Sequence, residues 1–185
     1  LPKNFYICFM ADFIKFYPLL AVCEGGLSDS PYDKGGFTNM GITWGSFQNA
    51  VLAGVIDYPL TKEGLAKISP DDVRRIAKLW YWDAMRCDSI KDQKIANSLA
   101  DACFNCGANG SSVLMQKSLN SFGHNLVVDG IIGEKSLKAI NETDAKVLLL
   151  KFNFMRSEFY KGIVSADKSQ LPNLRGWLNR VQKYA

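Results

Sequence analysis

The sequence has little of what many active sites require. It contains a single histidine, His124, among 185 residues. One histidine excludes a metal site built from several histidine ligands. It also leaves little room for nucleophilic systems in which histidine acts as the base. Chemistry on carboxyl groups is therefore favoured, and neither a metal nor a cofactor is expected.

Long apolar runs are also missing. The richest stretch, residues 5–22, is interrupted by Asp12 and Lys15, so no run reaches the roughly 18 residues of a membrane span. Residues 3–9 resemble an export signal only faintly, and Met10 would suit a natural start. We expect no stable membrane insertion and no clear signal peptide. Synthesis in the cytoplasm would then be followed by another route of release.

Neither charge nor cysteine content indicates a special partner. Lys and Arg number 22 against 18 Asp and Glu, and the net charge of +4 is spread along the chain. Nucleic acid is therefore not an expected partner, whereas a polyanionic bacterial wall is compatible. Five cysteines without framework spacing predict free thiols. For Cys103 and Cys106, packing in a helix is favoured over a zinc or redox role.

The apolar pattern predicts a mainly α protein without repeats or a β-rich region. Asp12, Thr43, Ser69 and Asp144 are suitable N-caps. Residues 27–42 are rich in turn-forming residues and predict a loop with a short hairpin. The expected helices cover residues 12–24, 43–53, 69–80, 93–106, 111–122, 134–140, 144–160 and 174–181. Within residues 144–160, five side chains are expected inside: Val147, Leu148, Phe152, Met155 and Phe159.

The helix over residues 93–106 has two distinct faces. Its apolar face is formed by Ile95, Leu99, Ala102, Cys103 and Cys106, and Gly107 would end it. The opposite row is polar and consists of Asn97, Asp101 and Asn105. Such a helix buries one face, so the polar row is expected to be wet or to line a cleft.

The chemistry is concentrated in residues 24–43, which combine acids, glycines and hydroxyl side chains. Hydrolysis of a glycosidic bond needs one protonated carboxyl group and a second polar group that holds water or stabilises positive charge. Glu24 would lie at a helix C-terminus among apolar neighbours, and both features raise a carboxyl pKa. Asp33, in a glycine-flanked polar loop, would stay ionised. Asp29 is the alternative second carboxylate.

Three motifs carry a specific resemblance to glycoside hydrolase family 108. They are Glu24-Gly25-Gly26, the run from Asp33 to Thr43 that reads Asp-x-Gly-Gly-x-Thr-Asn-x-Gly-Ile-Thr, and the pair Tyr81-Trp82. The family contains bacterial and phage N-acetylmuramidases with a lysozyme-like fold, some of them named secretion-activating proteins. The resemblance covers about residues 11–180. It implies that Glu24 is the catalytic acid, and a broader likeness to phage-type lysozymes implies that Asp33 and Thr38 position water.

The resemblance extends into the second half of the chain. Residues 99–107 resemble the Asp-x-x-x-Asn-x-Gly helix that floors the cleft in the family. Residues 115–120, 128–133 and 139–140 resemble its peptidoglycan-binding-type segment. This implies a catalytic region over residues 10–92 and a peptidoglycan-binding-type helical region over residues 93–185, packed as one compact unit. Leu27 and the sequence Glu134-Lys135-Ser136 depart from the family pattern. The implied substrate-binding residues are Asn39, Tyr81, Trp82, Asp101 and Asn105.

Each of these residues also has a purely structural explanation. Asp33 could form a turn with its own backbone, and Thr38, Asn39 and Thr43 could hold the loop. Among the adjacent aromatic residues, Trp80 is predicted to be in the core, while Tyr81 and Trp82 could either pack or stack on sugars. Asp101 and Asn105 could form a solvated polar face.

Together these observations predict a mainly α, lysozyme-like protein whose small loop and hairpin region carries the catalytic motif. It would cleave the bond between N-acetylmuramic acid and N-acetylglucosamine in peptidoglycan glycan strands. We expect a bacteriolytic monomer that acts at the bacterial cell wall, released through a pore as phage endolysins are. Two alternatives remain: a non-catalytic wall-binding or secretion-assisting protein, and a lytic transglycosylase.

Overall fold

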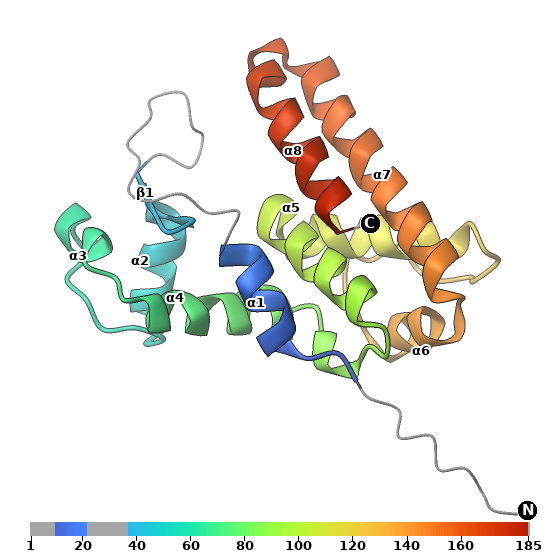
Figure 1. The fold of residues 1–185 in the computed structure, drawn as a ribbon, viewed down its shortest axis with the longest axis horizontal. Helices are drawn as coiled ribbons and strands as arrows, with labels where there is room; N and C mark the ends of the chain where they lie inside the picture. The colour runs from blue at the N-terminus through green and yellow to red at the C-terminus, as the bar shows by residue number, and fades with distance from the viewer. Residues whose placement is uncertain (1–9, 22–36, 185) are drawn as a thin grey trace, which may run out of the picture. The chain divides into compact units, whose positions relative to one another are not determined.

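The computed structural model describes residues 10–21 and 37–184 (Figure 1). These residues fall into two compact units. We call residues Ile14–Trp80 the hairpin unit, and residues 10–13 together with residues 81–184 the long-helix unit. Across the described ranges, no helix is both long enough and apolar enough to cross a membrane.

The hairpin unit contains a helix, a short β-hairpin and three further helices. In chain order these are α1 (Phe13–Ala21), β1 (Thr38–Asn39), β2 (Ile42–Thr43), α2 (Trp44–Leu52), α3 (Lys62–Ala66) and α4 (Pro70–Ala77). The hairpin turns at Met40 and Gly41, with φ angles of 47° and 78°. Positive φ at both central residues is typical of a type I′ turn, which matches the twist of the two strands.

Side-chain caps explain where the helices of this unit begin. The hydroxyl groups of Thr43, Thr61 and Ser69 accept hydrogen bonds from the backbone N–H groups of Ser46, Gly64 and Asp72. The predicted starts of α2 and α4 are thereby confirmed. The five-residue helix α3 was not predicted, because a single helical turn leaves little periodic signal.

The hairpin unit has its own apolar core. Phe47 and Ala50 of α2, Leu65 of α3 and Ile76 of α4 are all fully buried. Ile42 of β2 joins this cluster and ties the hairpin to the three helices.

The long-helix unit is built around two long helices. Its elements are the 3₁₀ turn η2 (Cys87–Ser89), α5 (Gln93–Asn120), α6 (Glu134–Glu142), α7 (Ala145–Ala166), the 3₁₀ turn η3 (Lys168–Gln170) and α8 (Leu171–Lys183). Helix α7 packs against both α5 and α8, and Figure 1 shows α7 and α8 running side by side. Asp92 and Asp144 cap α5 and α7 through their carboxylates.

Helix α5 is broken at Gly107, which has φ 73° and ψ 166°. The break separates two helices, as the sequence predicted, and the second of them reaches Asn120. The expectation of a wet polar row needs correction, because Asn97 and Asp101 are buried. The pattern of one helix cannot show whether its polar face meets water or the polar side chains of another helix.

The predicted interior of α7 is confirmed only in part. Leu148 and Phe152 are fully buried, whereas Val147 is 46% exposed and Phe159 is 37% exposed. The buried row also contains Asn153, Arg156 and Tyr160. The buried face of α7 is thus partly polar, and it is rotated relative to the face that the apolar pattern predicted.

A π-helical turn, η1 (Lys78–Asp83), follows α4. It contains the three adjacent aromatic residues, and the boundary between the two compact units falls within it, between Trp80 and Tyr81. Such turns are rare and often occur at functional sites.

Candidate active site

The two carboxylates expected to perform the chemistry, Glu24 and Asp33, lie outside the described residues, as does Asp29. Their catalytic roles therefore stay predictions. The described residues around them in the sequence are α1, which ends at Ala21, and the hairpin, which begins at Thr38.

The hairpin is held by the side chain of Asn39. Its Nδ2 atom donates to the carbonyl oxygens of Leu65 and Ala66, at 3.0 and 3.1 Å. Both carbonyls belong to the C-terminal end of α3, where helix carbonyls lack partners within the helix. Asn39 is buried, and its amide nitrogen anchors the hairpin. A contact between Asn39 and substrate stays a prediction.

Thr38 and Thr43 lie opposite each other in the hairpin, but their positions differ in function. The Thr43 hydroxyl is the N-cap of α2, at 3.2 Å from the Ser46 nitrogen. Thr38 is half-buried and is the N-cap of none of the described helices. Of the two threonines, only Thr43 therefore has a side chain that caps α2.

The burial of the three aromatic residues of η1 differs from the prediction. Trp82 is the fully buried ring, and its indole nitrogen donates to Asp88 at 2.5 Å. Trp80 is only partly buried against the core of the hairpin unit. Tyr81 is half-buried and meets the edge of Phe104, with ring centroids 5.0 Å apart. In this arrangement Tyr81, and not Trp82, presents part of its ring to solvent.

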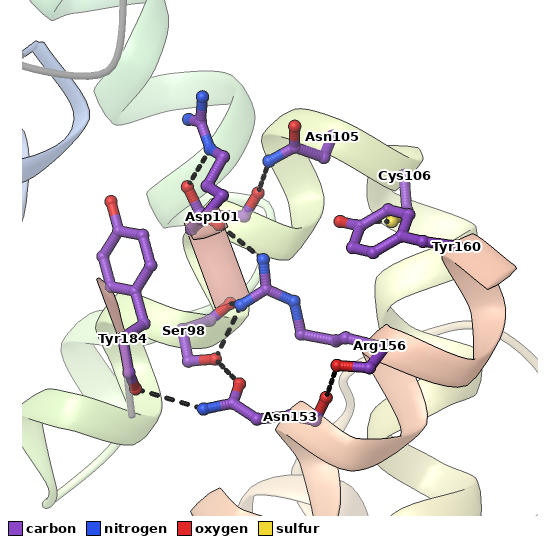
Figure 2. A network of polar contacts seen from close by, with 10 residues as sticks. Ser98, Asp101, Asn105, Cys106, Asn153, Arg156, Tyr160 and Tyr184 are labelled. Carbon is purple, nitrogen blue, oxygen red and sulfur yellow. Dashed lines mark hydrogen bonds and ion pairs between the residues drawn. The ribbon is translucent and has the colours of Figure 1, made fainter. Parts of the chain in front are cut away.

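Asp101 is the centre of a buried network of polar contacts in the long-helix unit (Figure 2). One carboxylate oxygen lies 2.5 Å from Arg156 Nη2 of α7, and the other lies 2.6 Å from Arg180 Nε of α8. The side chains of Asp101 and Arg156 are completely buried. One carboxylate therefore joins three helices, and its two oxygens are used by arginines.

The network continues from Arg156 toward the C-terminus. Arg156 Nη1 donates to the Ser98 hydroxyl oxygen, and the Ser98 hydroxyl donates to Asn153 Oδ1 at 2.6 Å. Asn153 Nδ2 then donates to the carbonyl oxygen of Tyr184 at 3.2 Å. Figure 2 shows these groups as a continuous chain between α5 and α7.

The remaining predicted site residue of α5, Asn105, bonds within its own helix. Its Nδ2 atom donates to the Asp101 carbonyl oxygen at 2.8 Å. Arg180 stacks its guanidinium 4.7 Å from the centre of the neighbouring Phe104 ring. Substrate binding by Asp101 and Asn105 stays a prediction, and the geometry shows Asp101 in a charge-pairing role.

Arg156 was missed in the sequence, although one signal pointed to it. It lies four residues after the buried Phe152 and four before the buried Tyr160, so it follows the buried stripe of α7. An arginine in such a stripe requires a buried acidic partner.

The two cysteines of α5 are free thiols, of which Cys103 is buried and Cys106 is half-buried. Burial raises the pKa of Cys103 to about 12, and burial also raises the pKa of Cys106, whose thiol donates to the Tyr160 hydroxyl at 3.4 Å. Among the described residues, no group of three or more His, Cys, Asp or Glu side chains could hold a metal ion.

Comparisons with known proteins identify the class. Residues 18–107 match the family model described as Glycosyl hydrolase 108, and residues 110–182 match the one described as Predicted Peptidoglycan domain. The protein is a glycoside hydrolase. More particularly, its residues 18–107 match glycoside hydrolase family 108, and a segment that matches a peptidoglycan domain follows them.

A solved structure supports the same fold. SagA from Brucella abortus is 24% identical, and the alignment covers 93% of this chain and 90% of that chain with a TM-score of 0.78. The expected mainly α, lysozyme-like fold with a small hairpin is thus confirmed. No curated protein matches the sequence.

Proposed function

We propose that this peptidoglycan hydrolase cleaves the glycosidic bond between N-acetylmuramic acid and N-acetylglucosamine, with Glu24 as the general acid. A protonated carboxyl group gives a proton to the leaving oxygen, and water held by a second polar group completes hydrolysis. Asp33 and Thr38 are the proposed water-holding groups. The observation that carries the proposal is the match of residues 18–107 to the glycoside hydrolase family, because this segment contains the Glu-Gly-Gly motif.

The second glutamate of this segment supports the choice of Glu24. Glu63 is fully exposed in the first turn of α3. A hydrogen bond from its own backbone, and a second from the Thr61 side chain, lower its pKa. A carboxyl group with a lowered pKa stays ionised near neutrality and is a poor proton donor. Glu24 is therefore the better candidate for the acid.

The substitution Glu24→Gln tests the proposal, with Glu63→Gln as the matched control. Loss of a general acid lowers the rate by about 10²–10⁴-fold. We expect this loss for Glu24→Gln and no significant loss for Glu63→Gln, measured as new reducing ends released from purified peptidoglycan. Full activity of Glu24→Gln with unchanged thermal stability would reject Glu24 as the acid.

The products of the same digestion identify the reaction. A hydrolase leaves a reducing N-acetylmuramic acid end, whereas a lytic transglycosylase leaves an anhydro sugar. Mass spectrometry of the fragments separates the two, and we expect the reducing sugar. Fragments absent altogether, with protein that still pellets with the wall, would instead indicate a non-catalytic wall-binding protein.

The proposed site of action is the bacterial cell wall, where the protein would act as a bacteriolytic monomer of the endolysin type. This rests on the two family matches. Release through a membrane pore is part of the proposal.

A further inference from the structure

Contacts between distant parts of the chain join the two segments that the family models match. Asp101 and Phe104 lie in the segment 18–107, whereas Arg180 of α8 lies in the segment 110–182. Arg180 Nε lies 2.6 Å from an Asp101 carboxylate oxygen, and its guanidinium carbon lies 4.7 Å from the centre of the Phe104 ring. The segment that matches the peptidoglycan domain therefore supplies a side chain to the segment that matches the glycoside hydrolase.

The guanidinium of Arg180 is held by the ion pair on one side and by the ring on the other. The Arg180 side chain is only 12% exposed, and the Asp101 carboxylate is completely buried. Since little water competes for such a pair, it is stronger than an exposed one. A planar guanidinium also stacks on an aromatic ring in a way that a lysine ammonium does not reproduce. Arg180 thus restricts the position of the Phe104 ring.

The Phe104 ring in turn contacts Tyr81 of the π-helical turn η1. The two ring centroids are 5.0 Å apart and the ring planes are at 75° to each other. This edge-to-face geometry is one of the favoured arrangements of aromatic pairs. Tyr81, Phe104 and Arg180 all belong to the long-helix unit. The three side chains therefore form one series of contacts that restricts the orientation of Tyr81.

Tyr81 is suited to contact a sugar. It is half-buried, and it lies in the segment that matches the glycoside hydrolase. The π-helical turn that carries it is of a kind that often occurs at functional sites. A tyrosine has a flat apolar ring and a polar hydroxyl group, so it can pack on a pyranose ring and form hydrogen bonds with sugar hydroxyl groups. Such packing depends on the orientation of the ring.

We propose that Arg180 is a positioning residue for the glycan: it holds the Phe104 ring, which orients Tyr81 for contact with a sugar. The inference rests on the proposed function, because it takes a glycan as the substrate. Arg180 and Phe104 have no part in proton transfer. An interaction that binds the ground state and the transition state equally affects KM and leaves kcat unchanged. The proposal therefore concerns KM.

A double-mutant cycle between Phe104 and Tyr81 tests the linkage. Phe104→Leu keeps an apolar side chain and removes the ring, and should raise KM for soluble stem-free glycan strands about two- to tenfold at unchanged kcat. Tyr81→Leu should raise KM at least as much. The double variant should match Tyr81→Leu alone, because Phe104 acts through Tyr81. Increases that multiply in the double variant, or a wild-type KM in Phe104→Leu, would overturn the proposal.

Phe154→Leu is the matched control. Phe154 of α7 also has a cation over its ring, since the Lys151 ammonium lies 5.6 Å from the ring centre. It is 56% exposed, and it takes no part in the contacts that lead from Arg180 to Tyr81. We expect a wild-type KM for this variant. An increase equal to that of Phe104→Leu would show a general effect of losing a ring, and would contradict the positioning role.

Two substitutions of Arg180 separate positioning from a purely structural role. Arg180→Lys keeps a positive charge beside Asp101, whereas Arg180→Met removes it, so Arg180→Met should have the lower melting temperature. Both variants should raise KM about two- to fivefold, because neither side chain has the planar group that covers the ring. A purely structural role predicts that Arg180→Lys restores KM together with stability. A wild-type KM in Arg180→Lys would therefore overturn the proposal.

Binding measurements separate this proposal from the catalytic one. Glu24→Gln should lose hydrolysis and still bind stem-free glycan strands, and addition of Phe104→Leu to it should weaken this binding, as measured by isothermal titration calorimetry. If hydrolysis persists in Glu24→Gln, the catalytic assignment fails, whereas a raised KM in Phe104→Leu still supports the positioning role. If Phe104→Leu leaves both binding and KM unchanged while Glu24→Gln is inactive, the positioning role fails and the proposed function stands.

Discussion

At the scale of single residues, Asp101 links three helices through one buried carboxylate. Its charge is completely removed from water and compensated by Arg156 and Arg180. An uncompensated buried charge costs several kcal/mol. Without the Asp101 carboxylate, the buried arginine charges would therefore destabilise the folded state. This explains why an acidic residue can occupy a position with no solvent contact.

The substitution Asp101→Asn should therefore destabilise the protein strongly. We expect a loss of about 3–5 kcal/mol in the free energy of unfolding, because two buried guanidinium groups lose their counter-charge. Urea denaturation measures the change. The control is Asp71→Asn, which removes an exposed pair with Arg74 at 3.1 Å and should cost no more than about 1 kcal/mol. Similar losses in both variants would contradict the role of the network.

At the scale of single elements, the helix starts of the hairpin unit depend on a few side chains. Helix α4 is the clearest case, because Asp72 Oδ2 accepts from the Ser69 hydroxyl at 2.7 Å and from the Tyr58 hydroxyl at 2.8 Å. The Ser69 hydroxyl oxygen in turn accepts from the Asp72 nitrogen. The first turn of α4 is thus linked to the loop that precedes α3.

This arrangement predicts a pH dependence of stability. The hydrogen bond from Ser69, followed by that from Tyr58, lowers the pKa of Asp72. A carboxyl group whose pKa is lower in the folded state contributes stability above its unfolded pKa of about 3.9, and loses it as the pH falls through the folded pKa.

We expect Asp72→Asn to lower the free energy of unfolding at pH 7 by about 1–2 kcal/mol. Below pH 4, the free energy of unfolding of this variant should decrease less steeply than that of the wild type. Asp57→Asn, at an exposed loop position, is the control and should leave both quantities unchanged. Chemical denaturation at several pH values measures them. If the free energy of unfolding of Asp72→Asn fell below pH 4 as steeply as that of the wild type, this carboxyl group would not be linked to folding.

How much was predictable depends on how local the cause is. The caps Thr43, Ser69 and Asp144 act over three residues, so the sequence predicted the helix starts correctly. The partners of Asp101 are 55 and 79 positions away, and no periodic pattern reports such a contact. Contacts distant in sequence also explain why Trp82 is buried and Trp80 is not, since tertiary packing decides which ring is covered. For the catalytic pair, the sequence motif remains the basis of the assignment.

At the scale of the whole molecule, the chain is organised as two units, each with its own apolar core. Leu65 belongs to the core of the hairpin unit, and Leu148 is buried in the long-helix unit. The boundary between the units, at Trp80 and Tyr81, differs from the domain boundary at residues 92 and 93 suggested by the sequence, which stays a prediction. The two family matches meet at residues 107 and 110.

Separate cores should be visible in amide hydrogen exchange. Replacing a fully buried leucine with alanine costs about 2–5 kcal/mol, and local unfolding follows cooperative units. We expect Leu65→Ala to accelerate exchange mainly over residues 42–77, and Leu148→Ala to accelerate it mainly in α5 and α7. Mass spectrometry of peptic fragments measures both. Uniform acceleration along the whole chain in either variant would show a single cooperative unit instead.

The carboxylate shared by α5, α7 and α8 also has an evolutionary consequence. A homologue that lacks Asp101 must also replace Arg156 and Arg180 or have another buried acid near them. Sequences that keep the buried arginines without a counter-charge would be unstable and would be removed by selection. Positions 101, 156 and 180 should therefore mutate in concert across homologues, and an apolar triplet at all three would be a viable replacement.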